Sequence, residues 1–504
     1  MRPVKPSTPV GSCPNDADPC MSTKADQRAS RRLFPMHMTP FEAYMLLDDS
    51  PRYPMTFILQ FEFEGDIDRS AFQSAVDQAL QRQPMLRAIV APAKGGRDCW
   101  ILPEQYNSQV LWGEFHAPIN QPTHIDYIDL RREIGFRCWV RHNERRARCV
   151  FLFHHAAVDG IAAYQVVGDI LWFYATGMGA TLQPLPDVDP TELRNRLRNN
   201  LSAEILKPSP PDERRLAIDR IRQPVAPLSN HCLQFDSEVP GHFPDILTLD
   251  FDKDQFRDLR LQAQERGQSI NDALLESLFV ALAQWNRAFK DDTIRGKICV
   301  NMPLDLRNDE EPQFMAANYV SYALVQRSSD EILDTSDFLE GLRNDLAHLK
   351  HTRFNSSFMR FLLEISTDES ENASQLLDKE GGLATLVFSN TGDPTRRFWV
   401  KLPRADDGLQ CGNLVLVDVS GSPPLRKDTR VALGVLTYQR KLRICIRSDR
   451  QYFSEPQTRL FLEHFAELFV SRKHNQLSTV LREAIENVPL THAAVSSAGG
   501  SLDT

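Results

Sequence analysis

The chain has 504 residues, of which 42% are hydrophobic and 25% charged, a composition that is ordinary for a globular protein. Because this length exceeds the size at which one hydrophobic core normally stops growing, two lobes are expected. The formal net charge of −9 argues against a nucleic-acid partner, which would call for a basic surface.

The first part of the chain predicts alternating strands and helices. Residues 1–35 are rich in Pro, Asp and Ser, which predicts a disordered N-terminal tail. Residues 56–64 alternate apolar and polar side chains as a half-buried strand does, and helical spacing after Asp68 predicts a helix. The apolar runs 136–141 and 147–153 flank a polar turn and predict a hairpin.

The second part of the chain continues this mixture after a long connection. Residues 181–245 are rich in Pro and charge and predict a crossover linker, with one helix near 191–206. Periodicity then predicts strands at 247–251, 297–303, 318–326, 385–389, 431–438 and 442–447, and helices at 254–266, 270–289, 336–353 and from 454 onward. The predicted fold class is α/β (α+β), with lobes at 36–180 and 246–480 and a flexible tail at 481–504.

Chemistry concentrates where the predicted hairpin meets a predicted helix at 161–174. His154 and His155 end the apolar strand, and Asp159 and Gly160 precede the helix. Imidazole is the side chain best suited to accept and return a proton near neutral pH, which makes His155 a candidate general base. Asp159 can hold the loop if a cation meets it, and Gly160 lets the backbone approach closely or turn sharply.

Other interpretations of these residues stay open. A single His after a strand is usually structural, and His154 is assigned that scaffold role. His and Asp are also metal ligands, but no HExxH or similar spacing supplies partners, so no metal site is predicted. A hydrolase would need an activated nucleophile, and no GxSxG motif is present.

The segment 154–160 resembles the HHxxxDG signature of the coenzyme A-dependent acyltransferase superfamily. The nearest groups are the wax ester synthase/diacylglycerol acyltransferases and free-standing condensation-domain proteins. Segments that resemble motifs of these groups, in the same order, are 38–43, 54–55, 82–87, 269–272, 302–307, 318–321 and 388–392. The superfamily also includes the plant BAHD acyltransferases, and the absence of a DFGWG run disfavours that branch. The sequence departs from the wax ester synthase pattern near 132–139 and after Asn390, which leaves the acyl chain length open.

The resemblance implies two chloramphenicol-acetyltransferase-like lobes that form a V around a central tunnel. His155 would lie in the tunnel and deprotonate the acceptor, which attacks a thioester directly. Asp159 would pair with an arginine, a place that Arg87 fits. The oxyanion donors are not identified; the amide of Gly160 and the side chain of Asn390 are candidates, although residues 389–392 fit a turn equally well.

The sequence therefore predicts an acyltransferase that moves an acyl group from acyl-CoA to a small hydroxyl acceptor. Coenzyme A thioester is the co-substrate, and no tightly bound cofactor is expected. Two alternatives stay open: a condensation enzyme that uses an acyl carrier protein thioester and an alcohol or amine acceptor, and a non-catalytic binding relative. Nine cysteines without CxxC pairs favour a cytoplasmic location. Peripheral contact with a membrane or lipid surface, and the choice between monomer and homodimer, stay open.

Overall fold

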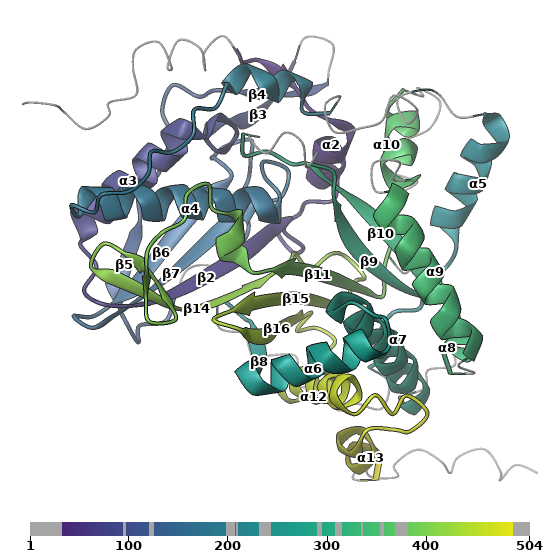
Figure 1. The fold of residues 1–504 in the computed structure, drawn as a ribbon. Coiled ribbons are helices and arrows are strands. Elements are labelled where there is room, and N and C mark those ends of the chain that lie inside the picture. The colour runs from purple at the N-terminus through teal and green to yellow at the C-terminus, as the bar shows by residue number, and fades with distance from the viewer. Residues whose placement is uncertain are drawn as a thin grey trace, which may run out of the picture.

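Two mixed β-sheets with helices packed on them make up the fold (Figure 1). In a computed structural model, the residues described are 33–93, 97–119, 125–197, 207, 210–230, 243–289, 295–307, 315–333, 336–352, 357–367 and 382–486. The predicted tails at 1–35 and 481–504 lie largely outside these residues. No helix of the described part of the chain is long and apolar enough to cross a membrane.

The first sheet has seven strands in the order β12-β13-β14-β2-β7-β6-β5. Its strands are β2 (Thr56–Glu64), β5 (Leu111–Glu114), β6 (Phe136–His142), β7 (Arg146–His154), β12 (Arg404–Ala405), β13 (Gly408–Cys411) and β14 (Leu414–Ser422). Helices α3 (Arg69–Arg82) and α4 (Gly160–Gly177) pack side by side over this sheet (Figure 1). The apolar residues of β2 and β7 are buried, so these central strands form the core of the lobe.

The second sheet has six strands in the order β10-β9-β11-β15-β16-β8. Its strands are β8 (Leu247–Phe251), β9 (Ile298–Asp305), β10 (Val320–Arg327), β11 (Leu386–Gly392), β15 (Val431–Tyr438) and β16 (Lys441–Ser448). Its helices are α6 (Lys253–Glu265), α7 (Ile270–Ala288), α8 (Ser329–Leu333), α9 (Ser336–Thr352), α10 (Ser357–Thr367), α12 (Glu455–Ser471) and α13 (Thr479–Glu486). Capping boxes at Ser269 and Ser454 satisfy the first amides of α7 and α12.

A crossover joins the two lobes, because β14 comes from the second half of the chain and pairs antiparallel with β2 of the first. Strands β12 to β14 therefore complete the first sheet, although the sequence places residues 246–480 in one C-terminal lobe. At the junction Gly434 of β15 faces Gly421 of β14, and an added Cβ on Gly434 would lie 2.7 Å from the carbonyl oxygen of Gly421. Only glycine allows the two strands to approach this closely.

A small third sheet and the start of the linker close one end of the first lobe. The sheet contains β1 (Met36–His37), β3 (Ile89–Pro92) and β4 (Asp98–Ile101), with α2 (Pro40–Leu47) and η1 (Pro84–Arg87) nearby in the chain. Arg196 follows the short helix η2 (Pro190–Asn195) and donates to both carboxylate oxygens of the fully buried Glu42 at 2.6 Å. This pair fixes the linker to the lobe.

The structure confirms the mixed α/β class and most elements predicted from periodicity. The predicted helix near 191–206 is instead the short helix η2, with residues 198–206 outside the described part, and α5 (Pro211–Arg222) follows it unpredicted. Also unpredicted are α2, α8, α10, α13 and the strands β1, β4, β5, β12, β13 and β14, and α13 overlaps the tail predicted at 481–504. The short elements among them show too few periods for a pattern to emerge.

A buried polar cluster in the second lobe gives a prediction about acid stability. Although burial opposes it, hydrogen bonds from His474 and Gln268 and the charge of Arg472 lower the pKa of Glu276 from 4.5 to about 2. A carboxyl with a depressed folded-state pKa stabilises the fold above its unfolded pKa and loses this contribution as pH falls toward the folded value. We therefore expect Glu276→Gln to lower the thermal midpoint at neutral pH. Thermal unfolding should show the gap from wild type narrowing between pH 4.5 and about 2, and a gap that does not change with pH would contradict this.

Candidate active site

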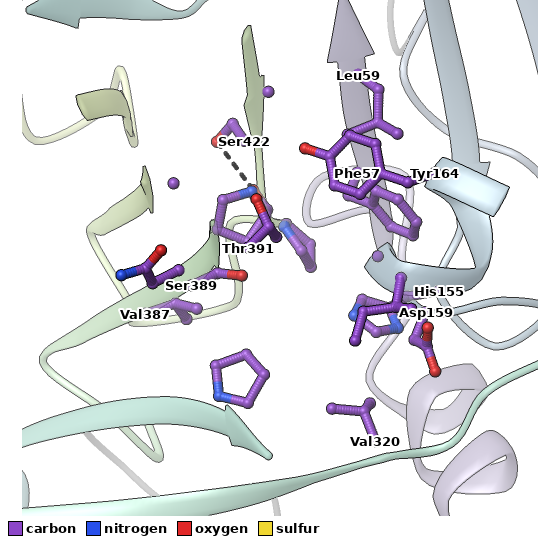
Figure 2. A pocket seen from close by; sticks show the side chains of 18 of the residues that line it. Phe57, Leu59, His155, Asp159, Tyr164, Val320, Val387, Ser389, Thr391 and Ser422 are labelled. Carbon is purple, nitrogen blue, oxygen red and sulfur yellow. Dashed lines mark hydrogen bonds between the residues drawn. The ribbon is translucent and has the colours of Figure 1, made fainter. Parts of the chain in front are cut away.

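A cavity of about 180 Å³ lies where the two sheets meet. One wall comes from β2 and the start of α4, and the other from β11 and β15 (Figure 2). Figure 2 shows Phe57, His155 and Tyr164 on one side of the cavity, and Val387, Ser389 and Thr391 of β11 opposite them. Most lining side chains are apolar, which suits a ligand with an apolar body and a few polar groups.

His155 lines this cavity directly after the end of β7. Its backbone N–H donates to the carbonyl of Met55 at 2.7 Å, and its backbone carbonyl accepts from Asn318 Nδ2 at 2.6 Å. The imidazole also hydrogen-bonds to the backbone carbonyl of His155 itself. Asn318 Nδ2 also lies 3.4 Å from His155 Nδ1, so the second lobe approaches the ring of His155 as well as its backbone.

Burial sets the protonation state of His155. The residue is 8% exposed, and desolvation lowers its pKa below the ordinary 6.5, against the opposing effects of its own carbonyl and of Asp159. Removing a charged imidazolium from water is unfavourable, so the neutral ring is favoured at pH 7. A neutral imidazole, with one ring nitrogen able to accept a proton, is the form that a general base requires.

Asp159 caps helix α4 and joins the two lobes. Its Oδ1 accepts from the Ala162 amide and from Arg307 Nη2, both at 2.9 Å, and its Oδ2 accepts from the Tyr319 amide at 2.7 Å. Arg307 and Tyr319 belong to the second lobe, flanking β9 and β10. Three donors on one buried carboxylate fit a positioning role for Asp159.

The arginine that pairs with Asp159 is Arg307 and not Arg87. Arg87 lies in η1, hydrogen-bonds to Tyr106, and does not line the cavity. The resemblance to condensation domains suggested Arg87 as the partner. In the structure Asp159 pairs instead with Arg307, which lies 148 residues further along the chain.

Two further predicted site residues, His154 and Gly160, lie in different places relative to the cavity. His154 is fully buried; its Nδ1 accepts from the Ala156 amide and its Nε2 lies 3.3 Å from Asp49 Oδ2, as a scaffold residue would. Gly160 lines the cavity, but an added Cβ would meet no atom within 4 Å, so close approach of the backbone does not explain this glycine. Its missing side chain widens the cavity instead.

Asn390 also lines the cavity, near the bulged end of β11. Its Oδ1 accepts from the Gly392 amide at 3.1 Å, and Gly392 has a φ of +65°; residues 389–392 nevertheless form the bulged end of β11 and not a turn outside the strand. The Asn390 Nδ2 donates to Asn271 Oδ1 at 3.1 Å. Because Asn390 is exposed and lines the cavity, it stays a candidate oxyanion donor.

Asn318 and Arg307 were not predicted as site residues. Both lie in segments, 318–321 and 302–307, that carry the resemblance described above, but neither segment reveals its spatial partner. Asn318 holds the carbonyl of His155 and Arg307 holds Asp159, so the second lobe orients the candidate base of the first.

A second histidine cluster has the contacts of a Ser-His-Glu triad. His474 Nε2 lies 3.2 Å from Ser277 Oγ, and His474 Nδ1 lies 3.1 Å from Glu276 Oε1. Ser277 is fully buried, and its hydroxyl donates to the carbonyl of Ala273 at 3.0 Å, one helical turn away. With its proton engaged and no access to a substrate, Ser277 fits a structural role rather than that of a nucleophile. Among the described residues no group of three or more His, Cys, Asp or Glu side chains is placed to hold a metal ion.

Comparison with known proteins identifies the fold. No family model matches the sequence, and a search of curated proteins gives no match. The first condensation domain of the calcium-dependent antibiotic synthetase is 12% identical and superposes with a TM-score of 0.61 over 88% of this chain and 98% of that chain. The starter condensation domain of rhizomide synthetase, solved with C8-CoA and Leu-SNAC, is 12% identical with a TM-score of 0.59 over 88% and 95%.

A polyketide synthase associated protein is also similar. Polyketide synthase associated protein 5 from Mycobacterium tuberculosis is 15% identical, with a TM-score of 0.53 over 87% of this chain and 97% of that chain. Because these identities are low, the matches establish architecture and not activity. The chain has the two-lobed, chloramphenicol-acetyltransferase-like fold of condensation domains.

Proposed function

We propose that this protein is an acyltransferase that moves an acyl group from a thioester to a hydroxyl or amine acceptor, with His155 as general base. The observation that carries the proposal is the buried imidazole of His155, which lines a cavity between the two lobes and whose backbone carbonyl is held by Asn318 of the second lobe. The fold shared with condensation domains supports the same class of reaction.

The proposed reaction is a direct transfer. Nε2 of His155 accepts the proton of the acceptor, whose oxygen or nitrogen attacks the thioester carbonyl carbon. The resulting tetrahedral oxyanion collapses, the C–S bond breaks, and the thiolate takes the proton back from His155. Holding both substrates in one cavity removes much of the entropic barrier, and a positioned base contributes roughly 10²–10⁴-fold. The Gly160 amide, at the positive end of α4, and Asn390 are the proposed oxyanion donors.

The donor thioester has two candidate carriers. Coenzyme A is the first, and a neighbour of this fold was solved with C8-CoA. The phosphopantetheine arm of an acyl carrier protein is the second, because other neighbours are modules of peptide synthetases. Both carriers present the same thioester to His155, so the mechanism is common to them.

The test follows free thiol release from acyl-CoA thioesters of increasing chain length, with and without mixed alcohol and amine acceptors. Acceptor-dependent release supports the proposal and identifies the substrate class. If no acyl-CoA reacts, the same acyl groups on a carrier protein are assayed. Failure of both donors, with binding still measurable, would leave a non-catalytic binding protein.

The pH dependence of turnover follows from the burial of His155. Because only the neutral imidazole accepts a proton, kcat/KM should fall as pH drops through the pKa of His155, which burial places below 6.5. Initial rates measured from pH 4.5 to 9 should therefore show an acid limb centred below 6.5. Samples preincubated at each pH and assayed at pH 7 control for denaturation, and an acid limb centred above 6.5 would be inconsistent with this burial effect.

A further inference from the structure

A buried arginine in the cavity is not used by the proposed reaction. Arg426 lies on the loop between β14 and β15, lines the cavity, and is 5% exposed. Buried arginines are rare unless their donors are satisfied, since a guanidinium carries five N–H groups. The partners of this side chain therefore indicate what else the site is built to bind.

The guanidinium of Arg426 is fixed in place by the end of α2 and by β10. Its Nε donates to Asp48 Oδ2 at 2.6 Å, and Nη2 contacts the same oxygen. Its central carbon lies 4.9 Å from the ring centroid of Tyr44 and 5.7 Å from that of Tyr322. Two aromatic rings and a carboxylate thus hold the group rigidly, which is the preorganisation that a binding site needs.

One nitrogen of Arg426 remains unused. Nη1 is buried and has no hydrogen-bond partner among the residues that the structure describes. Leaving a buried donor of a charged group unpaired is costly, and such groups in native proteins are normally satisfied by a ligand, water or protein atom. Arg426 also lines the cavity, so an oxygen of the bound substrate becomes a partner for Nη1 once the side chains that cover this atom move aside.

The charges around the cavity decide what kind of oxygen this is. The lining includes three arginines and two aspartates, and Asp48 pairs with Arg426 from behind, although burial raises the pKa of Asp48 to about 7. The surroundings are therefore close to neutral without a ligand. A carboxylate would bring an unbalanced charge into a buried site, whereas a neutral carbonyl satisfies Nη1 without that desolvation cost.

We propose that Arg426 Nη1 donates a hydrogen bond to a neutral carbonyl oxygen on the substrate, distinct from the thioester carbonyl that reacts. This rests on the proposed function, because it assigns a feature to the substrate of that same cavity. The carbonyl belongs either to the acceptor, as an amide or ester, or to the acyl chain, as a keto group. Arg426 is thus a specificity-determining residue.

The first experiment uses the wild-type protein and matched probes, with affinity measured by calorimetry. On the acceptor side, 2-hydroxy-4-methylpentanamide is compared with 4-methylpentan-2-ol and with 2-hydroxy-4-methylpentanoate. On the donor side, 3-oxooctanoyl-CoA is compared with octanoyl-CoA. A hydrogen bond to a charged donor predicts roughly ten- to hundredfold tighter binding of the neutral carbonyl compound in one of the two sets. Equal binding within both sets, absence of binding in both, or preference for the carboxylate overturns the proposal.

The second experiment removes the donor. Arg426→Met should abolish the preference for the carbonyl compound while leaving the affinity of the carbonyl-free partner within about twofold. If Arg426→Met does not fold, Arg426→Lys is measured in its place, because it keeps a positive charge opposite Asp48. The exposed Arg396, outside the cavity, supplies the matched control Arg396→Met. Equal loss of affinity for both members of a pair contradicts the assignment.

Turnover separates this proposal from the proposed function. Where thiol release is observed, Arg426→Met should raise KM for the carbonyl substrate and leave kcat largely unchanged. A fall in kcat with constant KM would instead make Arg426 an oxyanion donor and overturn its binding role. If calorimetry shows the carbonyl preference but no thioester reacts, the proposed function fails and the binding site stands.

Discussion

Replacing His155 with alanine is expected to lower acceptor-dependent thiol release roughly 10²–10⁴-fold, because the variant lacks the base that takes the acceptor's proton. The loss should lie in kcat, because a general base acts on the chemical step. The contacts of residue 155 with Met55 and Asn318 use main-chain atoms that alanine retains. The variant should therefore keep its fold. Single-turnover kinetics with a saturating acceptor measure the effect on the chemical step.

Two comparisons make this result specific to the base. His116 is exposed on the first lobe and does not line the cavity, so His116→Ala should retain wild-type turnover. The thermal midpoint of His155→Ala should lie close to that of the wild type, whereas a loss of structure would be seen in both the midpoint and the circular dichroism. Full activity in a folded His155→Ala protein would show that another group takes the proton, whatever the fold.

The elements around His155 could be predicted from the sequence because each has a local cause. Alternation in 56–64 gives β2, the apolar run before His154 gives β7, and Asp159 followed by a helical pattern gives the capped start of α4. These three elements place the candidate base at the end of a buried strand. Their positions depend on side-chain periods of two and 3.6 residues, which are visible within about ten residues of sequence.

The partners of these elements could not be predicted in the same way. The pairing of β14 with β2 joins segments more than 350 residues apart, and nothing in either strand specifies the other. The ion pair of Asp159 illustrates the same difficulty. Arg87 and Arg307 both fit as a cation in the sequence, and only the relative position of the lobes selects Arg307.

Arg426 shows how a charged loop can mislead. The sequence around it is rich in Pro, Lys, Arg and Asp, which is typical of a solvated turn. In the structure the loop turns this one side chain inward between Tyr44 and Tyr322, where Asp48 at the end of α2 compensates its charge. Burial of a charge depends on a partner from another element, so local composition carries no sign of it.

Removing the carboxylate of Asp159 is expected to destabilise the junction between the lobes by about 3–5 kcal/mol, because Arg307 would remain buried with its main counter-charge gone. The helix cap and the bond to the Tyr319 amide are lost in the same substitution. Equilibrium denaturation of Asp159→Ala should show the loss. Arg307→Met should be destabilising as well.

A double-mutant cycle distinguishes the ion pair from the other contacts of Asp159. Once Arg307 is replaced by Met, removing Asp159 no longer leaves a buried charge without a counter-charge. The double variant should therefore lose less stability than the sum of the losses in the two single variants. Additive effects would mean that the pair is not coupled.

Asp159→Asn keeps an oxygen for the helix cap and provides the kinetic test. If Asp159 positions His155 through α4 and the second lobe, the turnover of this variant should decline in step with its stability. If the variant has wild-type stability but little turnover, Asp159 instead takes part in the chemical step.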